Sequence, residues 1–517
     1  MRRRSRGCAR FRWWCWSAPR RVEEAMIRRP ISCCLAAAFA AVLPVAAAPA
    51  PVAPGPGGGD VGPAQPSASV ADVPASADVS ASPPDAGGAP APEPEAAPGL
   101  ASSYDKWFTD EALRVELYHL GGAHDEQYVF DRAVREPLWP GMRRVLLDVT
   151  GYGKYRFRVQ DRASGTTIFS QGFCTLFGEW QATPEALESR QRRVFEESVR
   201  FPFPRAPVRL LLDRREDVPG PDGRGEFREL FHFDIDPASH LVARDPPDDR
   251  YARLALHESG DPRERIDILI LGDGYTAAEL EKYRRDARRF AAILLADPAF
   301  APNRDAINIW GLETPSRDSG PDEPRKGWYR DTVLGTTFNT FDSERYLTTS
   351  HDRALRETAA YAPYDTLYIL VNTSRYGGGG IYNQWAIFPS DNEYDDYVFL
   401  HEFGHSFAGL ADEYFDSGTA YDEAFYPAGV EPWEPNITAL LPGRPLKWQS
   451  LVAAGTPIPT PDDEAHAALV GAFEGAGYKA KGLYRPYRDC RMFHKGRVPF
   501  CPVCAASFET VIRLYVP

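Results

Sequence analysis

The sequence lacks an excess of basic residues outside its first segment. Its 517 residues include 59 Lys and Arg against 72 Asp and Glu, a formal net charge of −13. Residues 1–30 contain ten Arg and two Glu, and residues 31–100 contain six acidic residues and no Lys or Arg, which leaves −15 for residues 101–517. Sequence-independent binding of nucleic acid needs a basic face. The composition therefore excludes nucleic acid as the leading partner and argues against docking on an anionic membrane.

Cysteine is scarce in the part of the chain that can fold. Four of the eight cysteines lie in the first 34 residues, and the body of the chain keeps Cys174, Cys490, Cys501 and Cys504. So few cysteines exclude a small disulfide-framed protein, and a chain with 43% hydrophobic residues can form a core without one.

The N-terminal segment has no apolar run that is comfortably long enough to span a membrane. Residues 31–48 form an alanine-rich run that Pro44 interrupts, at the short limit for a span. An Arg pair precedes this run and small residues end it, which is typical of a signal peptide. We therefore predict an N-terminal extension and signal peptide over residues 1–48, with translation starting at Met26. The protein is then secreted, periplasmic or on the cell surface of a bacterium; a membrane anchor is the alternative.

Residues 49–100 contain 13 prolines among Ala, Ser, Gly and Asp and almost no large apolar side chains. Such a segment cannot bury enough surface to offset the entropy of ordering. We predict a disordered Pro/Ala-rich spacer between the signal peptide and the folded domains.

Residues 101–260 contain short segments that partly alternate apolar and polar residues, separated by Gly-Gly, Pro-Gly and Asp-Gly pairs. This pattern is typical of an all-β sandwich. We expect strands over residues 112–119, 143–149, 154–159 and 207–212. The segment groups no residues into a catalytic arrangement, and we expect structural or surface roles for Asp110, His119, His124 and Cys174.

Residues 261–517 alternate strand and helix patterns, which predicts a mixed α/β domain. We expect strands over residues 266–271, 307–312, 366–371 and 384–388. The capping box Thr276-Ala-Ala-Glu279 opens a helix to about Leu295, and a second helix begins near Val398. The chain is thus predicted to be multidomain, with a β-sandwich before an α/β domain.

The second predicted helix carries the motif His401-Glu402-Phe-Gly-His405. Side chains four apart lie on one face of a helix, so both imidazoles can reach one zinc ion at about 2.0–2.1 Å. Glu402 is rotated from that face and can act as a general base toward the attacking water. Apolar residues around the motif predict burial, and buried ionisable groups need a metal or hydrogen-bond partners.

A catalytic zinc needs a third protein ligand and an open position. The metzincin pattern H-E-x-x-H-x-x-G-x-x-H is not matched strictly, because the chain has alanine at positions 408 and 411. If the last two positions of the pattern are shifted by one residue, Gly409 ends the helix and Asp412 is the third ligand. Glu413 is the nearest competitor. In the gluzincin alternative the third ligand is a glutamate from a later helix, such as Glu423, Glu464 or Glu474. The lesser candidates are His466 and His494.

Taken together, these residues resemble the IgA-peptidase family of bacterial zinc metallopeptidases, which is placed near the metzincins. The similarity lies in residues 401–414, 471–476, 482–486, 490–492 and 500–504, and upstream in 268–275 and around 173–180. It covers about residues 103–517. The resemblance implies a zinc endopeptidase with His401 and His405 as ligands, Asp412 as third ligand and Glu402 as base. It also implies that Met492 lies in a Met-turn beneath the zinc.

Four further features have open interpretations. Cys490 paired with Cys501 or Cys504 in a disulfide is favoured over a metal or redox centre, because export predicts an oxidising compartment. The run Gly377–Gly380 is either an edge strand that receives an extended peptide or a flexible loop. An oxyanion-stabilising tyrosine is to be sought among Tyr382, Tyr414 and Tyr484. A solvated acidic loop is favoured over a calcium site for Asp412, Glu413, Asp416, Asp422 and Glu423.

The sequence therefore predicts a secreted zinc-dependent endopeptidase with one catalytic zinc ion, acting as a monomer on protein or peptide substrates, with immunoglobulin or another glycoprotein as one candidate. Two alternatives remain open at this point. One is an exported binding protein with a structural or degenerate metal site. The other is a zinc hydrolase of non-peptide amides.

Overall fold

The computed structural model describes residues 104–244, 247–415 and 425–516, all within one compact unit that spans Gly87–Pro517. The predicted signal peptide, residues 1–48, and the spacer, residues 49–100, lie outside the described residues. A search of the described helices finds none with the length and apolar character that a membrane crossing requires.

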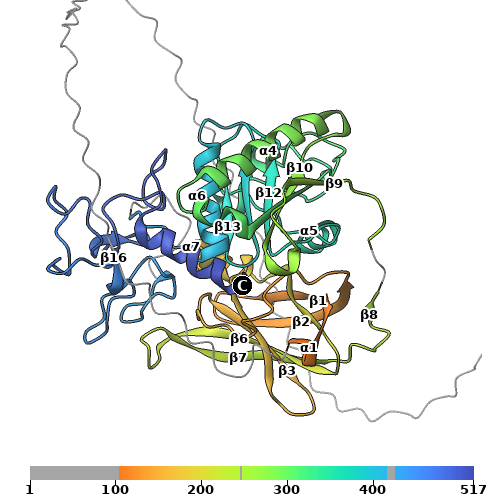
Figure 1. Ribbon diagram of the computed structural model, residues 1–517, viewed down its shortest axis with the longest axis horizontal. Coiled ribbons are helices and arrows are strands. Elements are labelled where there is room, and N and C mark those ends of the chain that lie inside the picture. The colour runs from red at the N-terminus through yellow and green to blue at the C-terminus, as the bar shows by residue number, and fades with distance from the viewer. Residues whose placement is uncertain (1–103, 245–246, 416–424, 517) are drawn as a thin grey trace, which may run out of the picture. The chain divides into compact units, whose positions relative to one another are not determined.

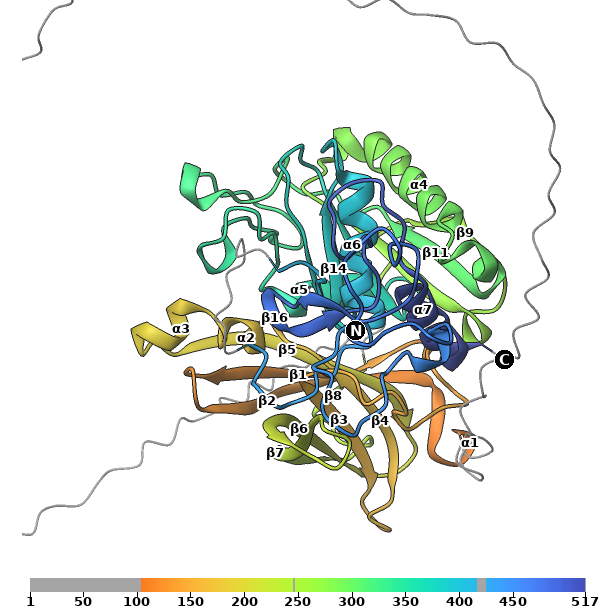
Figure 2. The same cartoon turned by 90° about the vertical axis from the view of Figure 1, so that its left-hand side faces the viewer.

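The N-terminal part is a β domain of two four-stranded sheets, which Figure 2 shows as stacked layers. One sheet has the order β5-β1-β2-β8 and the other β4-β3-β6-β7. The strands are β1 Phe108–Gly121, β2 Glu126–Glu136, β3 Tyr155–Asp161, β4 Thr167–Phe173, β5 Arg193–Pro204, β6 Val208–Pro219, β7 Gly225–Ile235 and β8 Val242–Ala243. Three short helices accompany them: α1 Tyr104–Trp107, α2 Leu176–Trp180 and α3 Pro184–Ser189.

Alternating side chains build the core of this β domain. In β3 every second residue is buried, so Tyr155, Phe157 and Val159 point into one core with residues of the facing sheet such as Val115 and Phe201. The predicted N-terminal β domain is confirmed, and its two sheets pack around a shared core.

The strand expected over residues 143–149 is wrong, because this segment is irregular. Its backbone makes two hydrogen bonds to Ser170 of β4: Leu146 O accepts from Ser170 N, and Asp148 N donates to Ser170 Oγ, both at 2.9 Å. Asp148 then accepts from the backbone N–H groups of Thr150 and Gly151, at 2.9 and 3.1 Å. Such a side-chain turn gives the backbone an alternative to a sheet ladder, so the alternating pattern here does not continue as a strand.

The C-terminal part contains a six-stranded sheet with the order β13-β14-β12-β10-β11-β9. Strands β10, β11, β12 and β14 run parallel, and β9 and β13 pair antiparallel at the two edges. The strands are β9 Arg253–His257, β10 Ile266–Asp273, β11 Ile307–Leu312, β12 Thr366–Val371, β13 Gly379–Ile381 and β14 Trp385–Pro389. Strand β9 precedes residue 261, where the sequence places the start of the second domain, and belongs to this sheet.

Helices cover both faces of the six-stranded sheet. These helices are α4 Leu280–Ala296, α5 Asp352–Ala359, α6 Asp395–Ala408 and α7 Pro502–Tyr515. Ile268 and Ile270 of β10 pack with α4, α6 and α7, while Leu269 and Leu271 pack with α5 and with α2 of the β domain. Figure 1 shows α4 and α6 side by side on the sheet. The predicted capping box is present, with Thr276 N donating to Glu279 Oε2 at 2.9 Å before α4. A hairpin of β15 Phe473–Ala476 and β16 Lys479–Arg485 lies between α6 and α7 in the sequence.

Candidate metal centre

Helix α6 places the His-Glu motif, and aromatic packing fixes the helix. Phe399 and Phe403 each stack on Tyr368 of β12, with ring centroids 4.5 and 4.7 Å apart. At the first turn of the helix, Arg289 of α4 donates to Asp395 at 2.7 Å. The helix ends at Gly409, whose φ of 62° lies in the left-handed region that glycine tolerates. The following residues therefore turn back toward the motif.

The two histidines of the motif present their Nε2 atoms to each other at 3.2 Å. Their Nδ1 atoms face backbone carbonyls, His401 that of Arg491 at 3.2 Å and His405 that of Leu410 at 2.6 Å. Because a carbonyl oxygen can only accept, each Nδ1 must carry the hydrogen in a neutral ring. Each Nε2 then offers a lone pair, which is the arrangement expected of imidazole metal ligands.

Asp412 completes the cluster after the turn at Gly409. Its Oδ1 lies 3.1 Å from His401 Nε2 and 3.3 Å from His405 Nε2, and its side chain is buried. Its Oδ2 accepts a hydrogen bond from Tyr478 of the hairpin at 2.5 Å. The structure thus brings together the three residues that the sequence proposes as ligands.

The negative charge of Asp412 favours a cation among the three lone pairs. Burial lowers the pKa of His405, but the nearby Asp412 carboxylate outweighs burial and raises this pKa to about 9. The same histidines hold the pKa of Asp412 well below its usual range, although burial opposes them. Two imidazole nitrogens and one carboxylate oxygen are an acceptable zinc donor set, so the residues present fit the metal that the sequence predicts.

Glu402 lies beside the cluster, half-buried, and its carboxylate faces the run Gly377–Gly380. A Cβ atom on Gly378 would come within 2.7 Å of Glu402 Oε1, and one on Gly380 within 2.4 Å of Glu402 O. These glycines therefore allow the edge strand β13 to approach α6. Burial raises the pKa of Glu402, while the charges of His401 and His405 oppose the rise.

Met492 lies under α6 and is fully buried. A Cβ atom on Gly404 would lie 3.0 Å from its sulfur, so the thioether packs directly against the helix between the two histidines. The carbonyl of Met492 accepts from the backbone N–H of Glu413 at 2.8 Å, and the preceding carbonyl, that of Arg491, holds His401. One loop thus supports both the helix and the segment that carries Asp412.

A cavity of about 480 Å³ opens at this cluster, and both domains line it. The C-terminal part contributes His401, Glu402, His405, Asp412, Tyr382, Tyr414 and the run Gly377–Gly380. The β domain contributes charged residues that include Lys154, Arg214, Glu216 and Asp217. Of the three tyrosines considered from the sequence, Tyr382 and Tyr414 line this cavity and Tyr484 does not.

The other residues considered as ligands lie elsewhere. Glu413 points away from the histidines to a group of cysteines. Three more of these candidate residues form ion pairs at the surface: Glu464 pairs with Arg488, His466 with Asp463, and His494 with Asp489. Glu474 is exposed on β15. Glu423, Asp416 and Asp422 lie outside the described residues. Asp412 and Glu413 are buried in two separate clusters, so these two residues do not support a calcium site in this acidic segment.

Sequence reasoning missed the residues that surround the ligands. Tyr478 contacts Asp412, and the hydroxyl of Tyr397 lies 3.3 Å from His401 Nδ1. Tyr397 stands four residues before His401, a helical spacing that offers a usable signal. Tyr478 is 66 positions from Asp412, and no local pattern connects the two.

The disulfide expected at Cys490 is absent from the structure. All four cysteines of the described residues are free, and the sulfurs of Cys490 and Cys504 are 3.8 Å apart, well beyond a bond of about 2.05 Å. Elsewhere, His119 is a core residue of the β domain, with Nε2 2.8 Å from Glu126 and Nδ1 3.0 Å from Glu197.

Comparison with known families gives two matches that together cover both domains. A family model described as IgA Peptidase M64 matches residues 254–467 and 462–512. A second, described as Peptidase M64 N-terminus, matches residues 103–220. No curated protein matches the chain significantly.

Proposed function

Because the chain belongs to the M64 family of IgA peptidases, and is therefore a metallopeptidase that hydrolyses peptide bonds, we propose that it is an exported, zinc-dependent endopeptidase. In this proposal His401, His405 and Asp412 hold the zinc, and Glu402 is the general base. The observation that carries the assignment is the convergence of two imidazole nitrogens and one carboxylate oxygen within 3.3 Å of one another.

The separations between these ligand atoms support zinc. Four ligands at about 2.0–2.1 Å in a tetrahedron lie about 3.3–3.4 Å from one another. The three atoms are 3.1, 3.2 and 3.3 Å apart, close to this spacing without rearrangement. Three protein ligands leave one position open, as in catalytic zinc sites. Zinc in such a site supplies Lewis acidity and lowers the pKa of a water molecule to near 7.

Glu402 is the residue of the chain that moves the proton of the attacking water. Glu402 faces the cavity from the residue next to His401, where it can take a proton from the attacking water and deliver it to the leaving amine. Burial raises the pKa of its carboxyl, and the charges of His401 and His405 oppose the rise. No nucleophilic side chain is needed, so no covalent enzyme adduct forms.

We further propose that the peptidase domain is metzincin-like. Two features support this: the chain leaves α6 through the left-handed Gly409, and Met492 packs under the helix against Gly404. Asp412 takes the place of a third histidine in this pattern. A carboxylate carries a full negative charge, so it lowers the net charge of the zinc site relative to three neutral imidazoles.

An extended segment of protein fits the cavity better than a small amide does, because both domains line it. Strand β13 lies beside Glu402, but the backbone of the adjoining Gly378 already pairs with Arg345 and Leu347, so we propose that substrate binds in the cavity without adding a strand to this edge. Immunoglobulin is the first protein to try as substrate. Export by the predicted signal peptide and a monomeric state complete the proposal.

The test compares peptides released from a protein mixture by the zinc-loaded chain and by its Glu402→Gln variant, detected by mass spectrometry. Glu474→Gln is the matched control, since Glu474 is exposed and belongs to neither metal-ligating cluster of the described residues. We expect the parent and the control to release the same peptides and Glu402→Gln to release almost none. Equal release by a folded, zinc-loaded Glu402→Gln protein would overturn the assignment of the base. Cleavage of small acyl amides without peptide release would favour the amide-hydrolase alternative.

A further inference from the structure

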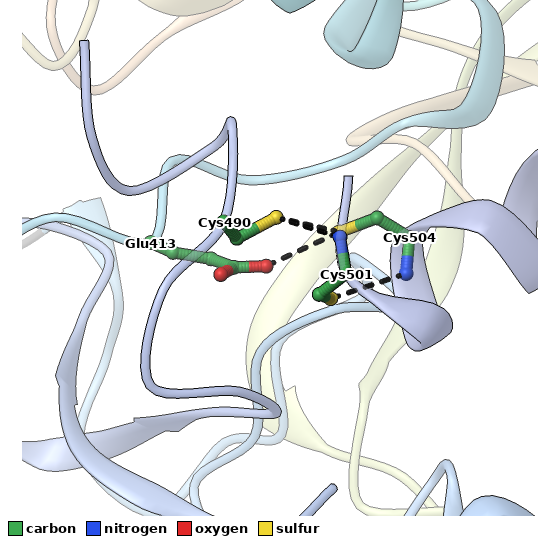
Figure 3. Close-up of side chains that lie close together, drawn as sticks. All are labelled: Glu413, Cys490, Cys501 and Cys504. Carbon is green, nitrogen blue, oxygen red and sulfur yellow. Dashed lines mark hydrogen bonds between the residues drawn. The ribbon is translucent and has the colours of Figure 1, made fainter. Parts of the chain in front are cut away.

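A second cluster of metal-ligating side chains lies next to the first and takes no part in the proposed catalysis. It consists of Glu413, Cys490, Cys501 and Cys504, whose side chains point toward one another (Figure 3). Their ligand atoms all lie within 4.8 Å of one another, and each residue is at most 3% exposed. We propose that this cluster is a structural zinc site with three thiolate ligands and one carboxylate ligand.

The spacing of the sulfurs favours a metal over a disulfide. A tetrahedral zinc ion with bonds of about 2.3 Å to sulfur holds two thiolates about 3.8 Å apart. Cys490 Sγ and Cys504 Sγ are separated by 3.8 Å, whereas a disulfide needs about 2.05 Å. Glu413 Oε1 is 3.2 Å from Cys504 Sγ, so the carboxylate reaches the same point as the sulfurs.

Backbone N–H groups support the sulfurs as charged ligands. The N–H of Cys501 points to Cys490 Sγ at 3.2 Å, and the N–H of Cys504 points to Cys501 Sγ at 3.5 Å. Cys501 is the N-cap of α7, so two cysteines of the C-x-x-C segment lie at the positive end of a fourteen-residue helix. Hydrogen bonds of this kind orient and stabilise metal-bound thiolates.

The carboxylate of Glu413 lacks a cationic partner among the described residues. Asn436 donates to its Oε1 at 2.9 Å, but Oε2 has no hydrogen-bond partner there and the side chain is fully buried. The nearby Arg485 directs its Nη1 to the carbonyls of Glu474 and Gly475 instead. A buried carboxylate is strongly disfavoured unless it is paired or binds a metal, and a metal ion here satisfies it.

The donor set and its closure define the ion and its role. Three soft thiolates select zinc among common divalent ions, and four protein ligands leave no open position, as in structural sites. Binding displaces the thiol protons to solvent, so the site forms more readily as pH rises. The ion would tie α7 to the loop of Cys490 and Met492 and to Glu413, the residue after Asp412. It would thereby stabilise the support of the first metal centre without touching the cavity.

The test is metal content of the full chain purified with zinc. We expect two zinc ions per parent chain and one in a His401→Ala/His405→Ala variant, which removes the first site. A zinc-free His variant would overturn the proposal. So would recovery of Cys490 in a disulfide with Cys501 or Cys504 after digestion without reductant. These two measurements leave the cysteines unchanged, so they decide the matter even if cysteine substitution prevents folding.

Cobalt gives a signature that separates the two sites. With Co²⁺ in place of zinc, we expect a thiolate-to-cobalt charge-transfer band in the near ultraviolet that persists in the His variant. A Cys501→Ser/Cys504→Ser variant should lose the band, and the matched control Cys174→Ser should keep it. A band that survives the cysteine substitution would contradict the site. A parent chain with the band but without peptidase activity would refute the proposed function and leave the structural site standing.

Discussion

Tyr478→Phe tests how the residues around the proposed zinc ligands set metal affinity. The hydroxyl of Tyr478 donates to Asp412 Oδ2 at 2.5 Å, while Oδ1 of the same carboxylate faces the two histidines. Phenylalanine keeps the ring that packs edge-on against Tyr414, with centroids 5.4 Å apart, and removes only the donor. A hydrogen bond to a charged group contributes about 1.5–3 kcal/mol, which corresponds to roughly 10- to 150-fold in an equilibrium constant.

We therefore expect Tyr478→Phe to weaken zinc binding about 10- to 100-fold, the range found when outer-shell partners of metal ligands are removed. Activity at saturating zinc should stay near that of the parent. The assay is competition with a chelator of known affinity, followed by activity across a zinc titration. Tyr484→Phe makes the same chemical change on the same hairpin, outside the cavity, and serves as control. An unchanged zinc affinity would refute the reasoning, and activity lost even at saturating zinc would place Tyr478 against the substrate instead.

Three further changes probe the framework of the site. Met492→Ala removes a fully buried side chain and should cost about 2–5 kcal/mol in denaturant unfolding, whereas a cost below about 1 kcal/mol would show that the thioether does not support α6. Gly380→Ala places a methyl group 2.4 Å from Glu402 O, and we expect a loss of about 1–3 kcal/mol together with reduced peptide release; full activity would contradict the close approach of β13. In the β domain, burial lowers the pKa of His119, but Glu197 and Glu126 outweigh burial and raise it. The stabilisation of the fold by protonated His119 is therefore complete below about pH 6.5 and is lost as pH rises through the higher pKa of the folded state. The difference in unfolding free energy between the parent and His119→Gln should therefore decrease as pH rises. A difference that increases with pH would refute this reasoning.

The sequence predicts well what depends on local spacing. The i, i+4 spacing of the two histidines and the glycine at the helix end were enough to propose His401, His405 and Asp412, and the structure places them together. The capping box before α4 and the buried strands β10, β11 and β12 follow from local patterns in the same way.

Features that depend on distant contacts were not accessible from spacing. Tyr478 reaches Asp412 from a hairpin, and Glu413 joins cysteines that are 77 to 91 positions away in the sequence. The predicted export favours a disulfide for these cysteines, and nothing in the sequence indicates that a buried carboxylate completes the group. Likewise the pattern at residues 143–149 is typical of a strand, but Asp148 accepts hydrogen bonds from the backbone N–H groups of Thr150 and Gly151 and forms a turn instead.

We propose that zinc binds between His401, His405 and Asp412. The most direct measurement is anomalous diffraction at the zinc edge from crystals of the zinc-loaded chain. We expect a peak bonded to the Nε2 atoms of both histidines and to Asp412 Oδ1, with one ligand position facing the cavity. A peak bound by a different third residue, or no peak at α6 in a protein that hydrolyses peptides, would contradict it.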